Sequence, residues 1–83
     1  MAQIALETTS HHSSEEIIAR AKKTFAEEYG LEITEEAECC LRMEGGGGFV
    51  YIRTEPKDDH TKVILEGVEW SRQLKDFMKM VAS

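Results

Sequence analysis

The sequence predicts an α+β domain, a two-layer sandwich in which two helices pack on one face of a mostly antiparallel sheet. Three features lead to this prediction: apolar residues alternate in strand-like stretches, two further stretches carry apolar residues at helical spacing, and turn-forming residues separate three consecutive strands. The expected order is strand, helix, three strands, helix. Because the chain has 83 residues, we expect residues 1–83 to form one domain with a single thin core.

The N-terminal part is predicted to form a strand followed by a helix. Residues 3–8 alternate between apolar and polar side chains, as in a strand with one buried face. Ser13 and Glu16 form the S-x-x-E pattern in which a serine hydroxyl caps the first turn of a helix, and Gly30 is well placed to end that helix. The apolar stripe of this helix consists of Ile17, Ile18, Ala21, Phe25 and Tyr29.

The rest of the chain is predicted to form three antiparallel strands and a second helix. The strands cover residues 37–44, 49–55 and 60–66. Ile33 is a candidate start of a separate short strand, because Glu35 and Glu36 interrupt the alternation that follows. The last helix begins near Trp70, and its apolar stripe consists of Trp70, Leu74, Phe77, Met78 and Val81.

The two turns between these strands predict a strand register. If residues 45–48 form the first loop, Glu44 pairs with Phe49, and if residues 56–59 form the second, Glu55 pairs with His60. Directly opposed residues share a face of the sheet, so both registers predict the same apolar face. That face collects Cys39, Leu41, Met43, Val50, Ile52, Val63 and Leu65, and the helices are expected to cover it.

Phe49, Tyr51 and Ile64 then fall on the opposite face, together with Arg42 and Arg53. An aromatic and aliphatic patch ringed by charges is typical of a protein-binding or dimerising surface. The alternative is that these side chains only pack across strands, with Arg42 lying over Tyr51. The first interpretation predicts a homodimer that uses this face as its partner surface.

The run from Gly45 through Gly46 and Gly47 to Gly48 is interpreted as a hairpin tip. A phosphate-binding loop opens a helix, whereas these glycines join two strands and no lysine follows them. Glycine supplies the positive φ that tight turns need. A flexible tip also suggests a loop that gates the space beneath Trp70, where a small apolar ligand would bind.

The two cysteines, Cys39 and Cys40, are adjacent in the sequence. Neighbouring residues of a strand point to opposite faces, so we expect free thiols, one buried and one on the surface. Free thiols favour a cytoplasmic location. A reactive Cys40 beside Arg53 is a further hypothesis. No nucleophile has a visible activator, however, so the sequence does not favour an enzyme.

The charge balance, 10 basic against 16 acidic residues, disfavours nucleic acid and anionic membranes as partners. Residues 46–52 partly match the central motif of the RNA-recognition domain, but the strand predicted after Pro56 stands where that fold needs a helix. No apolar run approaches the ~20 residues of a membrane helix. His60 with Asp58 and Asp59 is interpreted as a solvated turn, and we expect neither a metal nor a cofactor.

By element order, the predicted chain resembles a shortened helix-grip or TATA-binding-type topology. The resemblance concerns architecture only and implies no function. Two functional hypotheses follow from the residues. The first is a small cytosolic interaction module that associates with itself through the Phe49, Tyr51 and Ile64 face, and the second is a small domain that binds an apolar ligand behind the glycine hairpin.

Overall fold

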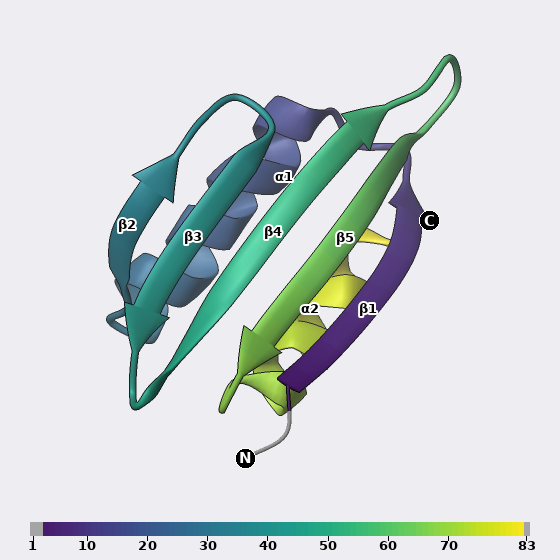
Figure 1. Cartoon of the computed structure of the whole chain (residues 1–83). Helices are drawn as coiled ribbons and strands as arrows, with labels where there is room; N and C mark the ends of the chain where they lie inside the picture. The colour runs from purple at the N-terminus through teal and green to yellow at the C-terminus, as the bar shows by residue number, and fades with distance from the viewer. Residues whose placement is uncertain (1–2, 83) are drawn as a thin grey trace.

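The computed structural model describes residues 3–82 and confirms the predicted α+β class. A five-stranded antiparallel sheet is accompanied by two α-helices, the first of which continues as a π-helix (Figure 1). The elements are β1 Gln3–Ser10, α1 Ser14–Ala21, the π-helix η1 Lys22–Glu28, β2 Glu32–Glu36, β3 Cys40–Gly45, β4 Gly48–Pro56, β5 Thr61–Val68 and α2 Ser71–Val81.

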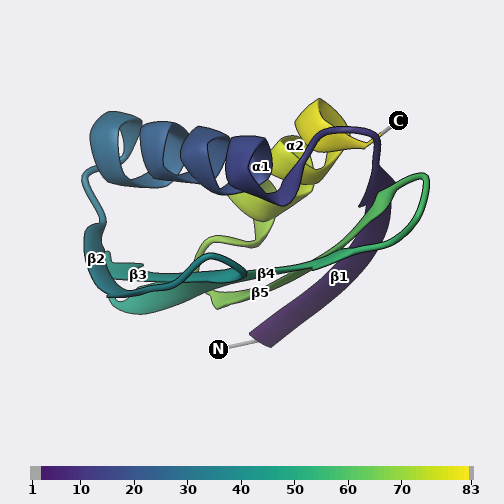
Figure 2. The ribbon, with the colours of Figure 1, turned by 90° about the horizontal axis from the view of Figure 1, so that it is seen from above.

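Both helices lie on the same face of the sheet, as Figure 2 shows. The opposite face carries no helix in the described part of the chain. Within residues 3–82, no helix is long and apolar enough to cross a membrane. The molecule therefore has two layers, with its core between the helices and one side of the sheet.

The strand order is β1-β5-β4-β3-β2, so the first and last strands of the chain are neighbours. β1 pairs with β5 over its whole length, from Gln3 opposite Val68 to Ser10 opposite Thr61. The place of the first strand in the sheet was not predicted from the sequence, because this pairing joins segments more than fifty residues apart and no turn connects them.

The structure has one more strand than the predicted order, namely β2, for which Ile33 was only a candidate start. All five residues of β2 are exposed, and β2 forms one edge of the sheet. Its register with β3 shifts between Ile33 and Glu35. This bulge explains why the alternation of apolar residues is broken there.

The first helix begins as predicted, with the Ser13 hydroxyl accepting a hydrogen bond from the Glu16 backbone N–H at 3.1 Å. Gly30 follows its end with φ +76°. The Tyr29 N–H bonds the carbonyl of Thr24, five residues back, at 3.2 Å. Tyr29 lies just after this π-helical segment and is 46% exposed, but its ring still packs against that of Phe25, with the ring centres 6.1 Å apart. The other members of the stripe, Ile17, Ile18, Ala21 and Phe25, are buried.

The predicted register of the glycine hairpin is confirmed, with Glu44 opposite Phe49. The chain reverses over two residues, Gly46 and Gly47, whose φ angles of +60° and +84° suit glycine. Gly45 and Gly48 are already paired as the last and first residues of their strands.

The predicted register of the second hairpin is wrong by two residues. Pro56, not Glu55, ends the paired region of β4, and it lies opposite Thr61. The Lys57 N–H bonds the His60 carbonyl at 2.8 Å, so Asp58 and Asp59 form the turn. Proline has no N–H to donate and is tolerated at the end of a strand. Because side chains alternate with a period of two, a shift of two leaves every residue on its predicted face.

The predicted division of the sheet into a covered and an open face is confirmed, with one exception. Six of the seven residues predicted to face the helices have no exposed surface: Leu41, Met43, Val50, Ile52, Val63 and Leu65. Leu74, Phe77 and Val81 of α2 pack against them, while Met78 is partly buried and Trp70 lies at the start of the helix. The exception is Cys39, which is exposed because it lies in the turn before β3.

Candidate functional site

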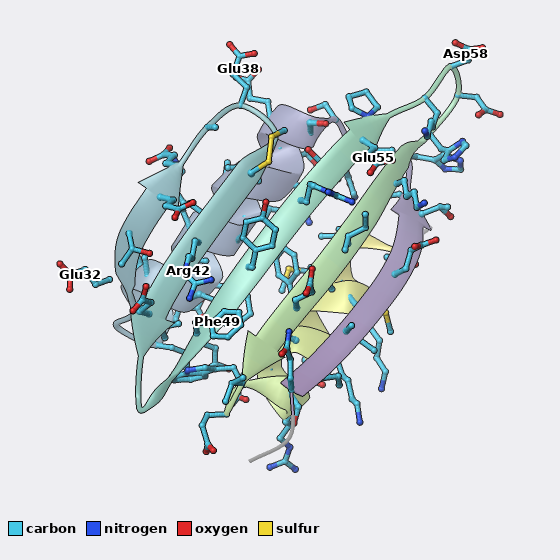
Figure 3. All side chains as sticks on the ribbon, in the orientation of Figure 1. Glu32, Glu38, Arg42, Phe49, Glu55 and Asp58 are labelled. Carbon is cyan, nitrogen blue, oxygen red and sulfur yellow. A yellow bond between two sulfur atoms is a disulfide. The ribbon has the colours of Figure 1, made fainter. Side chains whose placement is uncertain are left out.

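The three central strands present every second side chain on the side that the helices leave uncovered (Figure 3). We call this surface the open face. It consists of Cys40, Arg42, Glu44, Phe49, Tyr51, Arg53, Glu55, Lys62, Ile64, Glu66 and Val68. All five predicted surface residues therefore lie on one face.

Four apolar side chains form a strip across this face. Phe49 lies directly opposite Val68, and Ile64 lies diagonally across from Tyr51 on the neighbouring strand. All four are half-buried. The sequence analysis missed Val68, because Gly67 interrupts the strand pattern and the strand was predicted to end at residue 66. We call Phe49, Tyr51, Ile64 and Val68 the apolar strip.

Arg42 covers part of the apolar strip, but not the residue that the sequence predicted. Its guanidinium carbon lies 4.2 Å from the centre of the Phe49 ring, although Tyr51 is its directly opposed neighbour. The Arg42 Nε atom lies 3.2 Å from Glu44 Oε2. Since Glu44 is opposite Phe49, this ion pair draws the guanidinium along the strand toward that ring.

The other two cations of the open face are also paired with carboxylates. Arg53 lies 3.2 Å from Glu55, and Lys62 lies 3.6 Å from Glu7 on β1. Exposed ion pairs of this kind contribute only about 0–1 kcal/mol each to stability. Their effect here is to surround the apolar strip with charges that already have partners.

The glycine hairpin packs directly against the indole of Trp70. The Trp70 Nε1–H donates a hydrogen bond to the Gly45 carbonyl at 2.9 Å. A Cβ atom added to Gly46 would lie 2.9 Å from the Trp70 ring, so the absence of a side chain allows this approach. The tyrosine ring of Tyr29 lies 5.7 Å from the same indole on the other side. The predicted gating loop is therefore held in contact with Trp70, the residue beneath which it was predicted to gate a space.

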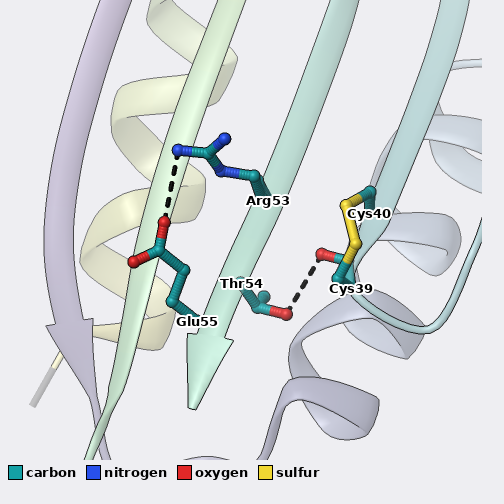
Figure 4. The surroundings of a disulfide bond; sticks show 5 residues. All are labelled: Cys39, Cys40, Arg53, Thr54 and Glu55. Carbon is teal, nitrogen blue, oxygen red and sulfur yellow. Dashed lines mark hydrogen bonds and ion pairs between the residues drawn. A yellow bond between two sulfur atoms is a disulfide. The ribbon is translucent and has the colours of Figure 1, made fainter. Parts of the chain in front are cut away.

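The prediction of free thiols is wrong, because Cys39 and Cys40 are joined in a disulfide (Figure 4). The prediction placed both residues in a strand, where neighbours point to opposite faces. The structure instead places Cys39 in a two-residue turn with Glu38, and only Cys40 begins β3. Both sulfur atoms can then lie on the same side of the backbone. Cys39 is exposed and Cys40 is half-buried.

The backbone around the disulfide is held by other bonds. Ala37 and Cys40 exchange two backbone hydrogen bonds, of 2.8 and 3.3 Å. The Cys39 carbonyl accepts from the Thr54 N–H at 2.8 Å and from the Thr54 hydroxyl at 3.1 Å. Thr54 is 2% exposed, so the anchor belongs to the core. A cross-link between neighbours closes almost no loop and contributes only about 1 kcal/mol by chain entropy, against ~3 kcal/mol for a 15-residue loop.

Arg53 lies directly opposite Cys40, as the hypothesis of a reactive thiol required. Its guanidinium is directed to Glu55 instead, on the side away from the sulfur atoms (Figure 4). The structure therefore brings the two residues to the same row of the sheet without placing the positive charge at the cysteine.

The turn between β4 and β5 contains the histidine and aspartates that were interpreted as a solvated turn. His60 Nδ1 lies 2.7 Å from Asp59 Oδ1, and this hydrogen bond lowers the pKa of the Asp59 carboxyl. Among the residues that the structure describes, no group of three or more His, Cys, Asp or Glu side chains is placed to hold a metal ion.

Comparisons with known proteins assign no family to the chain. No model of a protein family matches it, and no curated protein matches it. The function therefore has to be argued from the open face and the cysteine turn.

Proposed function

We propose that the chain is a small protein-interaction module and that two copies associate through their open faces. The observation that carries the proposal is the apolar strip of Phe49, Tyr51, Ile64 and Val68 on the side of the sheet away from the helices. An apolar patch with a charged rim is what interaction surfaces commonly present. A small domain also gains stability by covering a second surface.

The size of the sheet supports an interface. Five strands of up to nine residues form a surface of roughly 24 by 26 Å, or about 600 Å² in projection, at ~4.8 Å between strands and ~3.3 Å per residue. The side chains roughen this surface and raise its accessible area. A stable interface buries about 800 Å² on each partner, so association requires the outer side of all five strands, beyond the three strands of the open face.

The order of charges supports a dimer in which the two open faces meet across a twofold axis. The axis lies between the two sheets and runs parallel to β4. Such an axis places β3 over the partner's β5 and leaves β4 facing itself, with the rows of the sheet in register. Arg42 then lies opposite the partner's Glu66, because both residues belong to the row of Tyr51. Phe49 and Tyr51 each meet their own counterpart. The arrangement therefore combines an apolar centre with two symmetric pairs of opposite charge, although Arg53, which is paired with Glu55, also meets its own counterpart.

The test is the mass of the protein in solution, measured by light scattering. We expect twice the chain mass of 9.4 kDa, and the chain mass itself for Tyr51→Glu, which places a charge in the apolar strip. Met80→Glu is the matched control, because Met80 is 48% exposed on α2 and lies in the other layer. A wild-type protein that stays monomeric at millimolar concentration would overturn the proposal.

A charge exchange tests the twofold arrangement itself. Arg42→Glu and Glu66→Arg should each weaken the dimer, because like charges then face one another across the axis. The double variant restores opposite charges and should restore the dimer. If both single variants dimerise as tightly as the wild type, two copies associate in some other orientation.

The binding of an apolar ligand behind the glycine hairpin remains the second hypothesis, with less support. A ligand beneath Trp70 would have to displace the hydrogen bond between its indole and Gly45. The measurement is the fluorescence of Trp70, the only tryptophan, during titration with apolar compounds.

The predicted cytoplasmic location rested on free thiols. The disulfide removes that basis, so the location stays a prediction.

A further inference from the structure

We propose that the Cys39–Cys40 pair is a thiol–disulfide exchange site that is opened by dithiol reductants without unfolding the protein. The site is the turn between β2 and β3, and the inference does not depend on self-association. It rests on the exposure of the turn, on the hydrogen bonds that hold the turn, and on the charges around it.

The disulfide is accessible to thiols in solution on the side of Cys39. Cys39 is exposed, whereas the buried residues of the sheet begin one position beyond Cys40, at Leu41. The same turn forms one wall of an open groove through Ala37 and Glu38, and α1 forms the other wall. A thiol can therefore reach the Cys39 sulfur from solvent, while Cys40 is the more shielded of the two.

The turn is held by hydrogen bonds that do not depend on the disulfide. The two hydrogen bonds between Ala37 and Cys40 and the two from Thr54 to the Cys39 carbonyl involve neither sulfur atom. Breaking the sulfur–sulfur bond leaves all four in place. The two thiols consequently stay side by side after reduction, ready to form the disulfide again.

The exchange proceeds in two displacements. A thiolate of the dithiol reductant attacks Cys39 Sγ, the Cys39–Cys40 bond breaks, and Cys40 leaves as a thiolate that takes a proton from water. The second thiolate of the reductant then attacks the reductant sulfur of the mixed disulfide and releases Cys39. The protein gains two electrons and two protons, and the reductant becomes a disulfide.

The charges around the turn select among reductants. Glu35, Glu36 and Glu38 stand immediately before the cysteines, and Glu36 is paired with Lys22 at 2.5 Å. Glu35 lies opposite Arg42, and Arg53 lies opposite Cys40 but is paired with Glu55. Glu38 is the carboxylate next to Cys39 in the sequence, and it repels an anionic thiol such as glutathione. The site therefore favours neutral or cationic thiols, or a protein dithiol with a basic surface.

The first experiment tests reduction in the folded state. The protein is incubated with dithiothreitol, a neutral dithiol, and free thiols are counted by iodoacetamide alkylation and mass spectrometry. We expect two alkylated cysteines, an unchanged circular dichroism spectrum, and a midpoint of thermal unfolding lowered by less than about 8 °C. Thiols that appear only when the spectrum of the folded protein is lost would overturn the proposal.

The second experiment tests the site of attack and the charge selection. Cysteamine, a cationic thiol, is mixed with the protein, the reaction is quenched with N-ethylmaleimide, and the adducts are located by tandem mass spectrometry. We expect cysteamine on Cys39 and maleimide on Cys40. Each rate is divided by the concentration of the thiolate. At low salt the resulting rate for cysteamine should exceed that for glutathione about threefold, and the difference should disappear near 1 M salt.

Two variants complete the test. Glu38→Gln should reduce the difference between the exchange rates of cysteamine and glutathione. Glu27→Gln changes an exposed residue of η1 and should leave that difference unchanged. Cysteamine found mainly on Cys40, or equal rates at low salt, would contradict the stated site or its selectivity. Cys40 lies on the open face, so Tyr51→Glu, which is expected to be monomeric, should exchange at least as fast as the wild type does. Exchange without dimers, or dimers without exchange, then separates failure of the self-association from failure of the exchange.

Discussion

The two faces of the sheet are built from the same strands and differ in almost every other respect. On β4, Ile52 has no exposed surface and packs beneath the helices, while its neighbour Tyr51 is half-buried on the open face. The covered side of the central strands carries no charged residue, whereas the open face mixes ion pairs with an apolar strip. Stability therefore depends mainly on the covered face, and the open face is the one that we propose for self-association.

The helices pack on the covered face, so a change in the volume of its side chains should destabilise the fold. Phe25 of the π-helix and Phe77 of α2 lie with ring centres 5.7 Å apart, so that the two helices meet above the sheet. Interiors of this kind are close-packed, and a change in volume is felt by all neighbours. The open face lacks such a second layer within residues 3–82, and its side chains can change with little effect on folding.

The largest expected difference between the faces comes from truncating neighbouring residues of β4. Ile52→Ala removes buried methyl groups and leaves a cavity, and should lower the free energy of unfolding by about 2–5 kcal/mol. Tyr51→Ala should lower it by less than about 1 kcal/mol, because the site is open to water. Urea unfolding of both variants, in the monomeric range, measures the difference. Equal losses would mean that the open face contributes to the core.

A smaller difference is expected at the neighbouring residues Gly67 and Val68. A Cβ atom on Gly67 would lie 2.7 Å from both a Leu74 methyl and the Phe49 carbonyl oxygen, so Gly67→Ala has to displace both α2 and the neighbouring backbone of β4. We expect a loss of about 1–3 kcal/mol from this overpacking. Val68→Ala on the open face is the control and should cost less than about 1 kcal/mol. An unchanged stability of Gly67→Ala would show that both α2 and the backbone of β4 move at no measurable cost.

The smallest expected effect on stability concerns Arg42. Arg42→Gln removes the contact with the Phe49 ring and the ion pair with Glu44, and should cost about 0.5–1 kcal/mol. The same variant should weaken self-association clearly, if Arg42 faces the partner's Glu66. Arg72→Gln, on the exposed side of α2, is a control for the loss of a positive charge. A large loss of stability without a change in mass would contradict the division of roles between the faces.

The local features of the fold were predictable because neighbouring residues determine them. Ser13 and Glu16 marked the start of the first helix, and the glycine run placed a hairpin whose register follows from its length. The error in the second hairpin was harmless, since a shift of two residues exchanges partners without exchanging faces. Tyr29 packs on Phe25 as the stripe predicted but stays exposed, and the widening of the helix after Ala21 leaves no pattern in the sequence.

The cysteine turn could not be predicted for a different reason. Alternation of Ala37, Cys39 and Leu41 is equally compatible with a continuous strand and with a strand that begins at Cys40. The choice depends on β2, which folds back on β3 and forces the chain to turn at Glu38 and Cys39. The strand β2 itself is exposed at every position and therefore lacks the apolar signal that reveals a strand.

The amino-acid order by itself determined which side chains are covered and which are open, because the period of a strand is two residues and survives errors in pairing. It determined the helix start and the glycine hairpin for the same local reason. Only the tertiary structure decided that β1 lies beside β5, that β2 closes the other edge, and that Cys39 and Cys40 are joined. Those outcomes depend on contacts between segments that are far apart in the sequence. Such contacts are decided by packing, and they produce no periodic pattern of residues in the sequence.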